Sequence, residues 1–182
     1  MYFHHTYMKQ KISLLLLSII CSLYTFAQIP IKLYAYSQVV TSGMAPKRVI
    51  GENGNAVNTK KESPINYYIF AVYNSSVKIS FGEIWIKGKF YNTQIKNVDS
   101  TPVVSTNENI PGNPAKEILV PATKLKVVSI MPNGNKNSSL ARSSGFINMT
   151  KHSELIVSYI YKGKKYFITV KKIKLLQPVA GV

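Results

Sequence analysis

Apolar residues recur along the chain in short runs rich in Val, Ile, Tyr and Phe, and turn-forming residues separate one run from the next. No stretch longer than about ten residues has the 3.6-residue spacing of an amphipathic helix, so any helix is limited to a turn or two, near Ser138 to Ser143. Runs of this composition are typical of β-strands. The predicted strands lie at about 31–40, 65–73, 77–87, 89–96, 101–105, 117–130, 153–161 and 165–176.

Two connections are predicted to be hairpins. One is the Tyr73-Asn74-Ser75-Ser76-Val77 segment between the second and third runs, and the other is Tyr161-Lys162-Gly163-Lys164-Lys165-Tyr166 between the last two. In the second hairpin, two-residue and four-residue loops give the same parity of pairing, so the assignment of faces holds for both. The core face is expected to carry Leu155, Val157, Tyr159, Tyr161, Tyr166, Ile168 and Val170. The opposite face is expected to carry Ile156, Ser158, Ile160, Phe167, Thr169 and Lys171.

The number of runs and the long polar loops between them indicate the fold class. The polar loops at 41–64 and 131–145 exceed about 12–15 residues, and with the Pro-rich segment at 109–114 they are expected to be functional or mobile. About seven to nine strands with such loops predict an all-β protein, an immunoglobulin-like sandwich of two sheets. An outer-membrane barrel is the rival arrangement, but lysines on both faces of the last strand are unfavourable against lipid.

The first 27 residues have the three parts of a cleavable signal peptide. Lysines follow Met8, and the run from Ile12 to Leu23 is largely apolar. Small residues at Thr25 and Ala27 occupy the −3 and −1 positions of a cleavage site before Gln28. The apolar run is shorter than the roughly 20 residues that span a bilayer, so no transmembrane segment is expected after cleavage. Translation that begins at Met8 and a longer start at Met1 both fit this pattern.

Cleavage between Ala27 and Gln28 leaves residues 28–182, a length of 155 residues that is typical of one domain. The only cysteine, Cys21, leaves with the signal segment. An exported domain without disulfides favours a bacterial periplasm, cell surface or secreted location.

The remaining domain is strongly basic. Two of the 23 lysines and arginines lie in the signal segment, so residues 28–182 carry 21 basic and 7 acidic side chains, a net charge of +14. A field of this size attracts polyanions such as acidic glycans and anionic lipids. Lysines crowd the last hairpin beside Tyr161 and Tyr166, namely Lys162, Lys164, Lys165, Lys171, Lys172 and Lys174. Lysine and tyrosine together predict a polyanion-binding surface, while protection of an edge strand by lysine explains the same pattern.

Little in the sequence points to catalysis. After cleavage the only histidine is His152, expected on the surface at the start of a strand, and the seven acidic residues are scattered singly. A histidine-based nucleophile, a metal site and a pair of catalytic carboxylates all need more than this. The sequence therefore predicts no enzyme activity, no metal and no cofactor.

Trp85 poses a choice between core and surface. Strict alternation places Glu83 on the buried face between Phe81 and Trp85, at a high cost for a carboxylate. A bulge at Gly82 avoids this cost and turns Trp85 outward, where its ring can stack on a sugar. The general burial of large aromatic side chains favours the core position.

Together these features predict a non-enzymatic bacterial envelope protein that acts in the periplasm or at the cell surface as an interaction module. Its partner is expected to be an envelope protein, a glycan or an anionic polymer, with no specific binding of nucleic acid. The alternative is a glycan- or polyanion-binding module that uses Trp85, Tyr161, Lys162, Lys164, Lys165 and Tyr166.

Overall fold

The part of the chain that the computed structural model describes is mostly β-structure, as the sequence predicts. The described residues are 30–42, 63–107, 115–135 and 144–181. Their strands and helix belong to one compact unit, Ile31–Val182. The predicted cleavage site at Ala27 and Gln28 lies outside the described residues.

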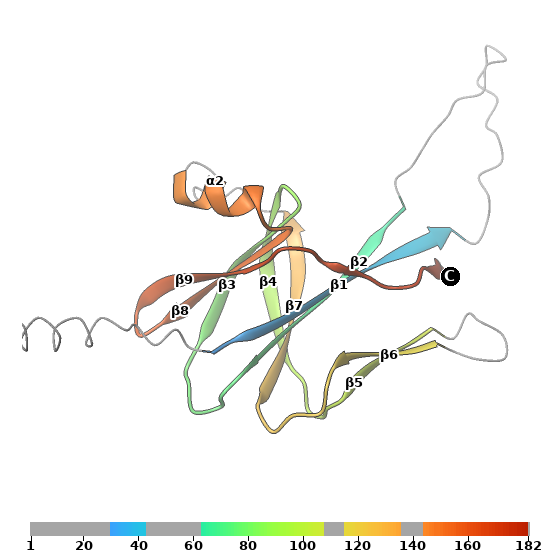
Figure 1. Ribbon diagram of the computed structural model, residues 1–182, viewed down its shortest axis with the longest axis horizontal. Coiled ribbons are helices and arrows are strands. Elements are labelled where there is room, and N and C mark those ends of the chain that lie inside the picture. Colours follow the sequence, from blue (N-terminus) through green and yellow to red (C-terminus); the bar gives the residue numbers. More distant parts are fainter. Residues whose placement is uncertain (1–29, 43–62, 108–114, 136–143, 182) are drawn as a thin grey trace, which may run out of the picture. The chain divides into compact units, whose positions relative to one another are not determined.

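The described elements are short strands and a single short helix, shown in Figure 1. They are β1 (Lys32–Ser42), β2 (Ile65–Tyr73), β3 (Ser80–Ile86), β4 (Lys89–Asn97), β5 (Val103–Asn107), β6 (Ala115–Val120), β7 (Lys126–Asn135), α2 (Ser144–Lys151), β8 (Leu155–Tyr161), β9 (Lys164–Val170), β10 (Lys174–Leu175) and β11 (Val179–Gly181). The predicted run at 117–130 is in fact two strands, because Pro121 follows β6 and has no N–H to continue a ladder.

Most of the strands form one sheet, in the order β10-β1-β2-β7-β4-β3-β8-β9, with β11 also paired to β1. Strands β10 and β11 run parallel to β1, and the other neighbours along this path are antiparallel. Strands β5 and β6 form a separate antiparallel pair. The sheet is curled, because strands from both halves of its path contribute to one core (Figure 1).

That core lies on what we call the inner face of the sheet. Its members come from β1, β2, β3, β7, β8 and the link after β9, and they are Ala35, Ile69, Ala71, Tyr73, Ile84, Ile86, Val128, Ile130, Leu155, Val157 and Ile173. Val, Ile and Leu at every second position of these strands supply the apolar area whose burial stabilises the fold. Leu155 and Val157 are part of this core, as predicted for the last hairpin.

The outer face of β1, β2 and β7 is covered by a second apolar cluster that includes the end of β6. Its buried members are Tyr36, Phe70, Val72, Leu119, Val120, Val127 and Leu176. The Tyr36 hydroxyl donates a buried hydrogen bond to the carbonyl oxygen of Leu119, at 2.7 Å. This bond joins β6 to β1 across 83 positions of sequence. The β5–β6 hairpin is thus tied to the main sheet by both packing and a specific polar contact.

Replacing Tyr36 with phenylalanine is expected to lower the free energy of unfolding by about 1–3 kcal/mol, because the buried Leu119 carbonyl loses its donor. Burial raises the pKa of Tyr36 above 10.0, so the native state holds this proton more tightly than the unfolded chain does. Its contribution to stability is complete below the unfolded-state pKa and is lost as the pH rises through the folded-state pKa. Urea unfolding at neutral and alkaline pH should therefore show a smaller alkaline loss in Tyr36→Phe than in the wild type. An equal loss in both proteins contradicts this role.

The predicted hairpin at residues 73–77 needs correction. Asn74 does form a turn, since its carbonyl accepts the Val77 N–H at 3.0 Å and its side chain accepts the Ser76 N–H at 3.0 Å. The turn does not make a hairpin, because β2 pairs with β1 and β7 while β3 pairs with β4 and β8. The predicted helical turn at 138–143 lies outside the described residues, and the observed helix α2 begins directly after it.

Candidate functional site

The last hairpin carries most of the residues that the sequence singles out, and the structure confirms its pairing. Strands β8 and β9 are antiparallel with Tyr161 opposite Lys164 and Leu155 opposite Val170. Lys162 and Gly163 form the two-residue turn, with positive φ angles of 48° and 74°. This is the turn geometry that matches the twist of the flanking strands. We call residues 161–172 the basic hairpin.

The structure divides the predicted ligand-binding residues between the two faces of the sheet. Tyr161, Lys164 and Tyr166 are on the inner side, in register with Tyr159, whose ring stacks on Tyr166 with centroids 5.4 Å apart. Burial raises the pKa of Tyr159, and the neighbouring Tyr166 acts in the same direction. Lys165 is on the outer face, since adjacent residues of a strand alternate.

Two of the lysines lie over aromatic rings. The Lys162 ammonium is 5.3 Å from the Tyr161 ring centroid, and the Lys165 ammonium is 5.8 Å from that of Phe167. Contacts of this kind hold the aliphatic stem against the ring while the charge stays in water. The predicted mixture of lysine and tyrosine is therefore present, but the rings support lysines instead of forming one open stacking platform.

Trp85 does not occupy the inner core, so the favoured buried position is wrong and the bulge alternative is correct. The register of β3 against β8 shifts between Phe81 and Ile84, which places an extra residue in β3 at Gly82 and Glu83. Ile84 and Ile86 then enter the inner core, and Trp85 is on the outer face, where it is half-buried. The bulge removes the conflict that strict alternation creates at Glu83.

The Trp85 ring is not an open sugar platform, because helix α2 covers this part of the outer face. Phe146 of α2 is only 3% exposed and makes an edge contact with Trp85, with ring centroids 6.4 Å apart. The Phe146 ring also stacks on Phe90 and makes an edge contact with Phe167, with ring centroids 5.3 Å and 5.9 Å apart. We call Trp85, Phe90, Phe146 and Phe167 the outer aromatic cluster. Sequence reasoning missed it, although an apolar Phe-Ile pair in a polar loop region was a signal for it.

Trp85 is also separated from the basic residues near the turn of the hairpin. It is opposite Ile156, which is opposite Thr169, four positions along β9 from Lys165. Four residues of strand correspond to about 13 Å. Trp85 and the lysines near the turn therefore do not form one compact site.

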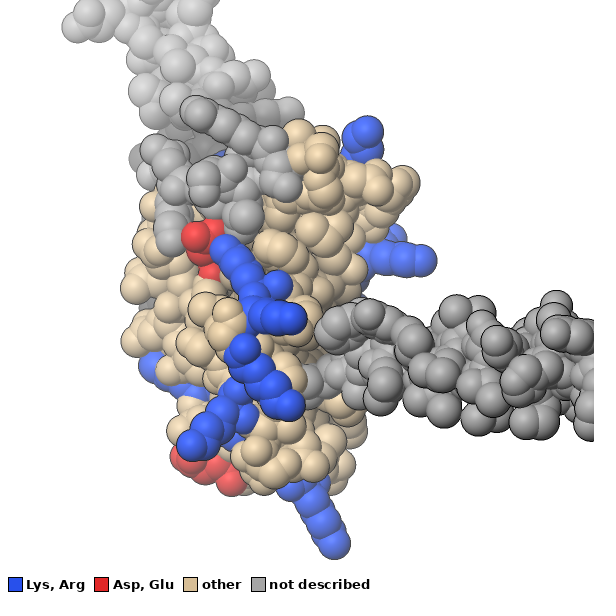
Figure 2. Space-filling view, turned by 90° about the vertical axis from the view of Figure 1, so that its left-hand side faces the viewer, with Lys and Arg blue, Asp and Glu red and all other residues tan. Residues whose placement is uncertain are grey.

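Exposed lysines gather along the basic hairpin itself. Five are exposed, namely Lys162, Lys164, Lys165, Lys171 and Lys172. The sequence contains no aspartate or glutamate after Glu154. Figure 2 shows the side of the molecule on which β8 and β9 lie at the left of Figure 1, with Lys and Arg side chains in a row across it and acidic side chains at the two ends of the row. The basic hairpin therefore carries exposed positive charge that favours the approach of anions.

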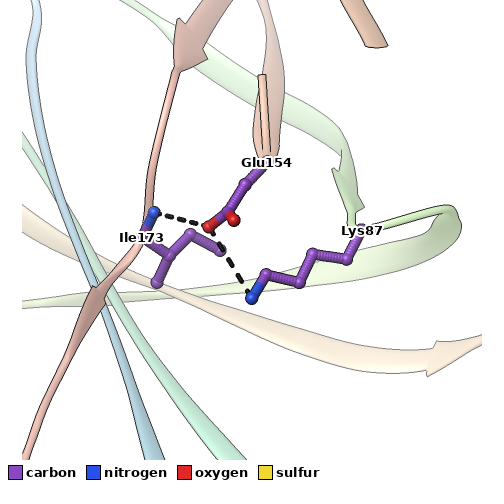
Figure 3. Close-up of polar contacts among 3 residues, drawn as sticks. All are labelled: Lys87, Glu154 and Ile173. Carbon is purple, nitrogen blue, oxygen red and sulfur yellow. Dashed lines mark hydrogen bonds and ion pairs between the residues drawn. The ribbon is translucent and has the colours of Figure 1, made fainter. Parts of the chain in front are cut away.

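Glu154, directly before β8, fixes the segment that carries the last of these lysines. Its carboxylate accepts the Ile173 N–H at 2.8 Å and is 3.6 Å from the Lys87 ammonium (Figure 3). Its own N–H donates to the Val170 carbonyl at 3.0 Å, and its carbonyl accepts the Lys87 N–H at 3.0 Å. The Ile173 side chain is in the inner core. Lys171 and Lys172 are thus presented on a short link anchored at both ends.

One predicted member of the lysine cluster is directed elsewhere. Lys174 lies on β10, beside β1, and its ammonium forms an ion pair with Glu117 of β6. The hydrogen bond to Glu117 raises the pKa of Lys174. The sequence placed Lys174 with the hairpin because it is close along the chain, whereas its contact is with a residue 57 positions earlier.

The described residues bring together little else that could do chemistry. His152 is exposed at the link between α2 and β8, as expected. Within the ranges that the structure describes, no three His, Cys, Asp or Glu side chains gather in a way that could hold a metal ion. In the same ranges, no helix has the length and apolar character needed to cross a membrane.

Comparison of the chain with protein-family models, with curated proteins and with solved structures gave no match. The candidate site consequently stands on its own geometry.

Proposed function

We propose that the protein is a non-catalytic, exported binding module of the bacterial cell envelope, acting in the periplasm or at the cell surface, and that its basic hairpin binds an anionic partner. The observation that carries this proposal is the set of exposed lysines on β9 and its flanking residues. A surface of this kind raises the local concentration of anions and favours their capture.

The fold supports a binding role of this type. Strands from both halves of the curled sheet pack on one core. The two sheets of an immunoglobulin-like sandwich pack in the same way, and we propose that architecture for this domain. Such a framework presents its hairpins on a rigid base. The hydrogen bond from the Ile173 N–H to Glu154 restrains the backbone that carries Lys171 and Lys172, which reduces the entropy lost there on binding.

Binding of a neutral glycan through Trp85 is the weaker proposal. The bulge turns the ring to the outer face as that role requires, but Phe146 packs against it. A stacking sugar needs an open ring face.

The experiment measures the affinity of the protein for dextran sulfate, with unsulfated dextran as the neutral probe. In the triple variant Lys162/Lys165/Lys172→Gln, the affinity at low salt is expected to fall by about tenfold or more, because three charges leave the binding surface. Affinity of the wild type should also weaken steeply as salt is raised, since screening acts on exposed charges.

The matched control removes the same charge elsewhere. Lys96, Lys116 and Lys124 are exposed on β4, β6 and the link after β6. Their replacement by glutamine should change the affinity by less than about threefold, because only the general field is reduced. Equal weakening in both triple variants would show that binding reports net charge alone, and the basic hairpin would lose its assigned role.

A further inference from the structure

We propose that β9 accepts an additional strand from an acidic partner protein, so that the partner binds by extending the sheet at its edge. This inference rests on the proposed function, because it uses the same basic hairpin. It adds the chemical class of the partner and the mode of contact.

Strand β9 is at one end of the sheet path. Among the described strands it forms ladder hydrogen bonds with β8 alone (Figure 1), and β1 comes close to it without pairing. An edge strand presents N–H and carbonyl groups that can pair with another extended chain. β9 has seven residues, which is long enough for several such hydrogen bonds.

The register identifies the groups that face outward. In a hairpin with a two-residue turn, the residues that flank the turn exchange hydrogen bonds, and every second pair does the same. In β9 these residues are Lys164, Tyr166, Ile168 and Val170. The backbone groups of Lys165, Phe167 and Thr169 consequently point away from β8. These three residues form the edge that an added strand would meet.

Charge decides which kind of strand fits. Lys165 is on β9, Lys162 is in its turn, and Lys171 and Lys172 follow directly after it. A second copy of this chain would bring an identical set of lysines to the edge, and like charges that face each other across strands are destabilising. An acidic strand gains from the same arrangement. Lysine on the edge therefore discourages self-association while it attracts a partner of opposite charge.

The side chains beside the edge indicate which sequence the partner strand should have. Lys165 and Phe167 are on the outer face of β9 and are two positions apart. Residues directly opposite each other in neighbouring strands interact through their side chains. The preferred partner segment thus has a glutamate or aspartate opposite Lys165 and an apolar residue opposite Phe167, with one residue between them.

The test uses a capped, fluorescently labelled peptide in which glutamate and valine alternate at every second position with threonine between them. A second peptide has the same sequence with N-methyl groups on its glutamate and valine residues. It keeps the charge, but the edge that would face β9 can no longer donate hydrogen bonds. The wild-type protein should bind the first peptide about tenfold or more tightly than the second, measured by fluorescence anisotropy.

Two variants locate the contact on the protein. Thr169→Pro removes a backbone N–H that points outward and leaves the pairing with β8 intact, a position at which an edge strand tolerates proline. It should weaken peptide binding about tenfold, while the affinity for dextran sulfate stays within about twofold, because no charge changes. Thr169→Ala keeps the N–H and should bind the peptide as the wild type does. Thermal unfolding checks that both variants are folded, and the N-methylated peptide supplies the same test on the unmodified protein.

The outcomes separate this inference from the proposed function. Equal affinity for the two peptides, or retention of dextran sulfate binding with no binding of the first peptide, overturns strand addition and leaves the basic hairpin as an anion-binding surface. If the wild-type protein binds neither the first peptide nor dextran sulfate, the proposed function itself is overturned.

Discussion

Phe146→Ala is expected to lower the free energy of unfolding by about 3–5 kcal/mol, the range for loss of a buried phenylalanine. Phe146 is nearly inaccessible and contacts three aromatic rings on β3, β4 and β9. Without it, α2 loses its main anchor and Trp85 becomes exposed to water. Chemical denaturation followed by the emission of Trp85, the only tryptophan, reports both effects. We expect a lower transition midpoint and a native emission maximum at longer wavelength.

Ile147→Ala is the matched control on the same helix. Ile147 is 43% exposed, so its truncation should change the stability by no more than about 0.5 kcal/mol. Phe146→Leu keeps an apolar side chain at the anchor, so its free energy of unfolding should lie between those of Phe146→Ala and Ile147→Ala. If Phe146→Ala and Ile147→Ala have the same stability and the same emission, the outer aromatic cluster does not hold the helix.

Gly82→Ala is expected to lower the free energy of unfolding by about 1–3 kcal/mol, as overpacking in a well-packed site does. A Cβ at Gly82 would lie 2.8 Å from the Ser158 hydroxyl oxygen, too close for two unbonded atoms. The surroundings are fixed, because the Gly82 carbonyl accepts a hydrogen bond from Thr93 at 2.6 Å and the Ser158 hydroxyl donates to the Glu83 carbonyl at 3.0 Å. Urea unfolding measures the change.

A double-mutant cycle with Ser158→Ala tests whether the clash is the cause. Removal of the serine hydroxyl gives the new methyl group room, so the double variant should be more stable than the sum of the single effects by about 0.5–3 kcal/mol. Gly145→Ala is the control, since the space around it is open and it lies in α2. Its stability should be unchanged or slightly higher. Strictly additive effects at Gly82 and Ser158 would argue against the bulge geometry.

Local chemistry made some features predictable. The β8–β9 hairpin followed from a lysine-glycine turn between two alternating runs. Its pairing is as predicted, and Leu155, Val157 and Val170 of the predicted core face do contribute to the inner core. The bulge in β3 could be anticipated because a glutamate stands where alternation would bury it. In each case the deciding interaction lies within a few residues of sequence.

Other features depend on contacts between distant parts of the chain. The turn at Asn74 is correctly placed, but its sequence cannot say that β2 pairs with β1 and β7. Likewise, the residues near Trp85 in sequence do not predict that Phe146 packs against it. Those near Lys174 do not predict its ion pair with Glu117. Long-range pairing and packing override local preference in such cases.

The location of the anion-binding surface is tested most directly by nuclear magnetic resonance of the backbone amides during titration with dextran sulfate. We expect the largest shift changes in residues 161–172, the basic hairpin, and we expect these changes to diminish in the Lys162/Lys165/Lys172→Gln variant. Changes that are largest on the β5–β6 hairpin, or spread evenly over all exposed lysines, would contradict it.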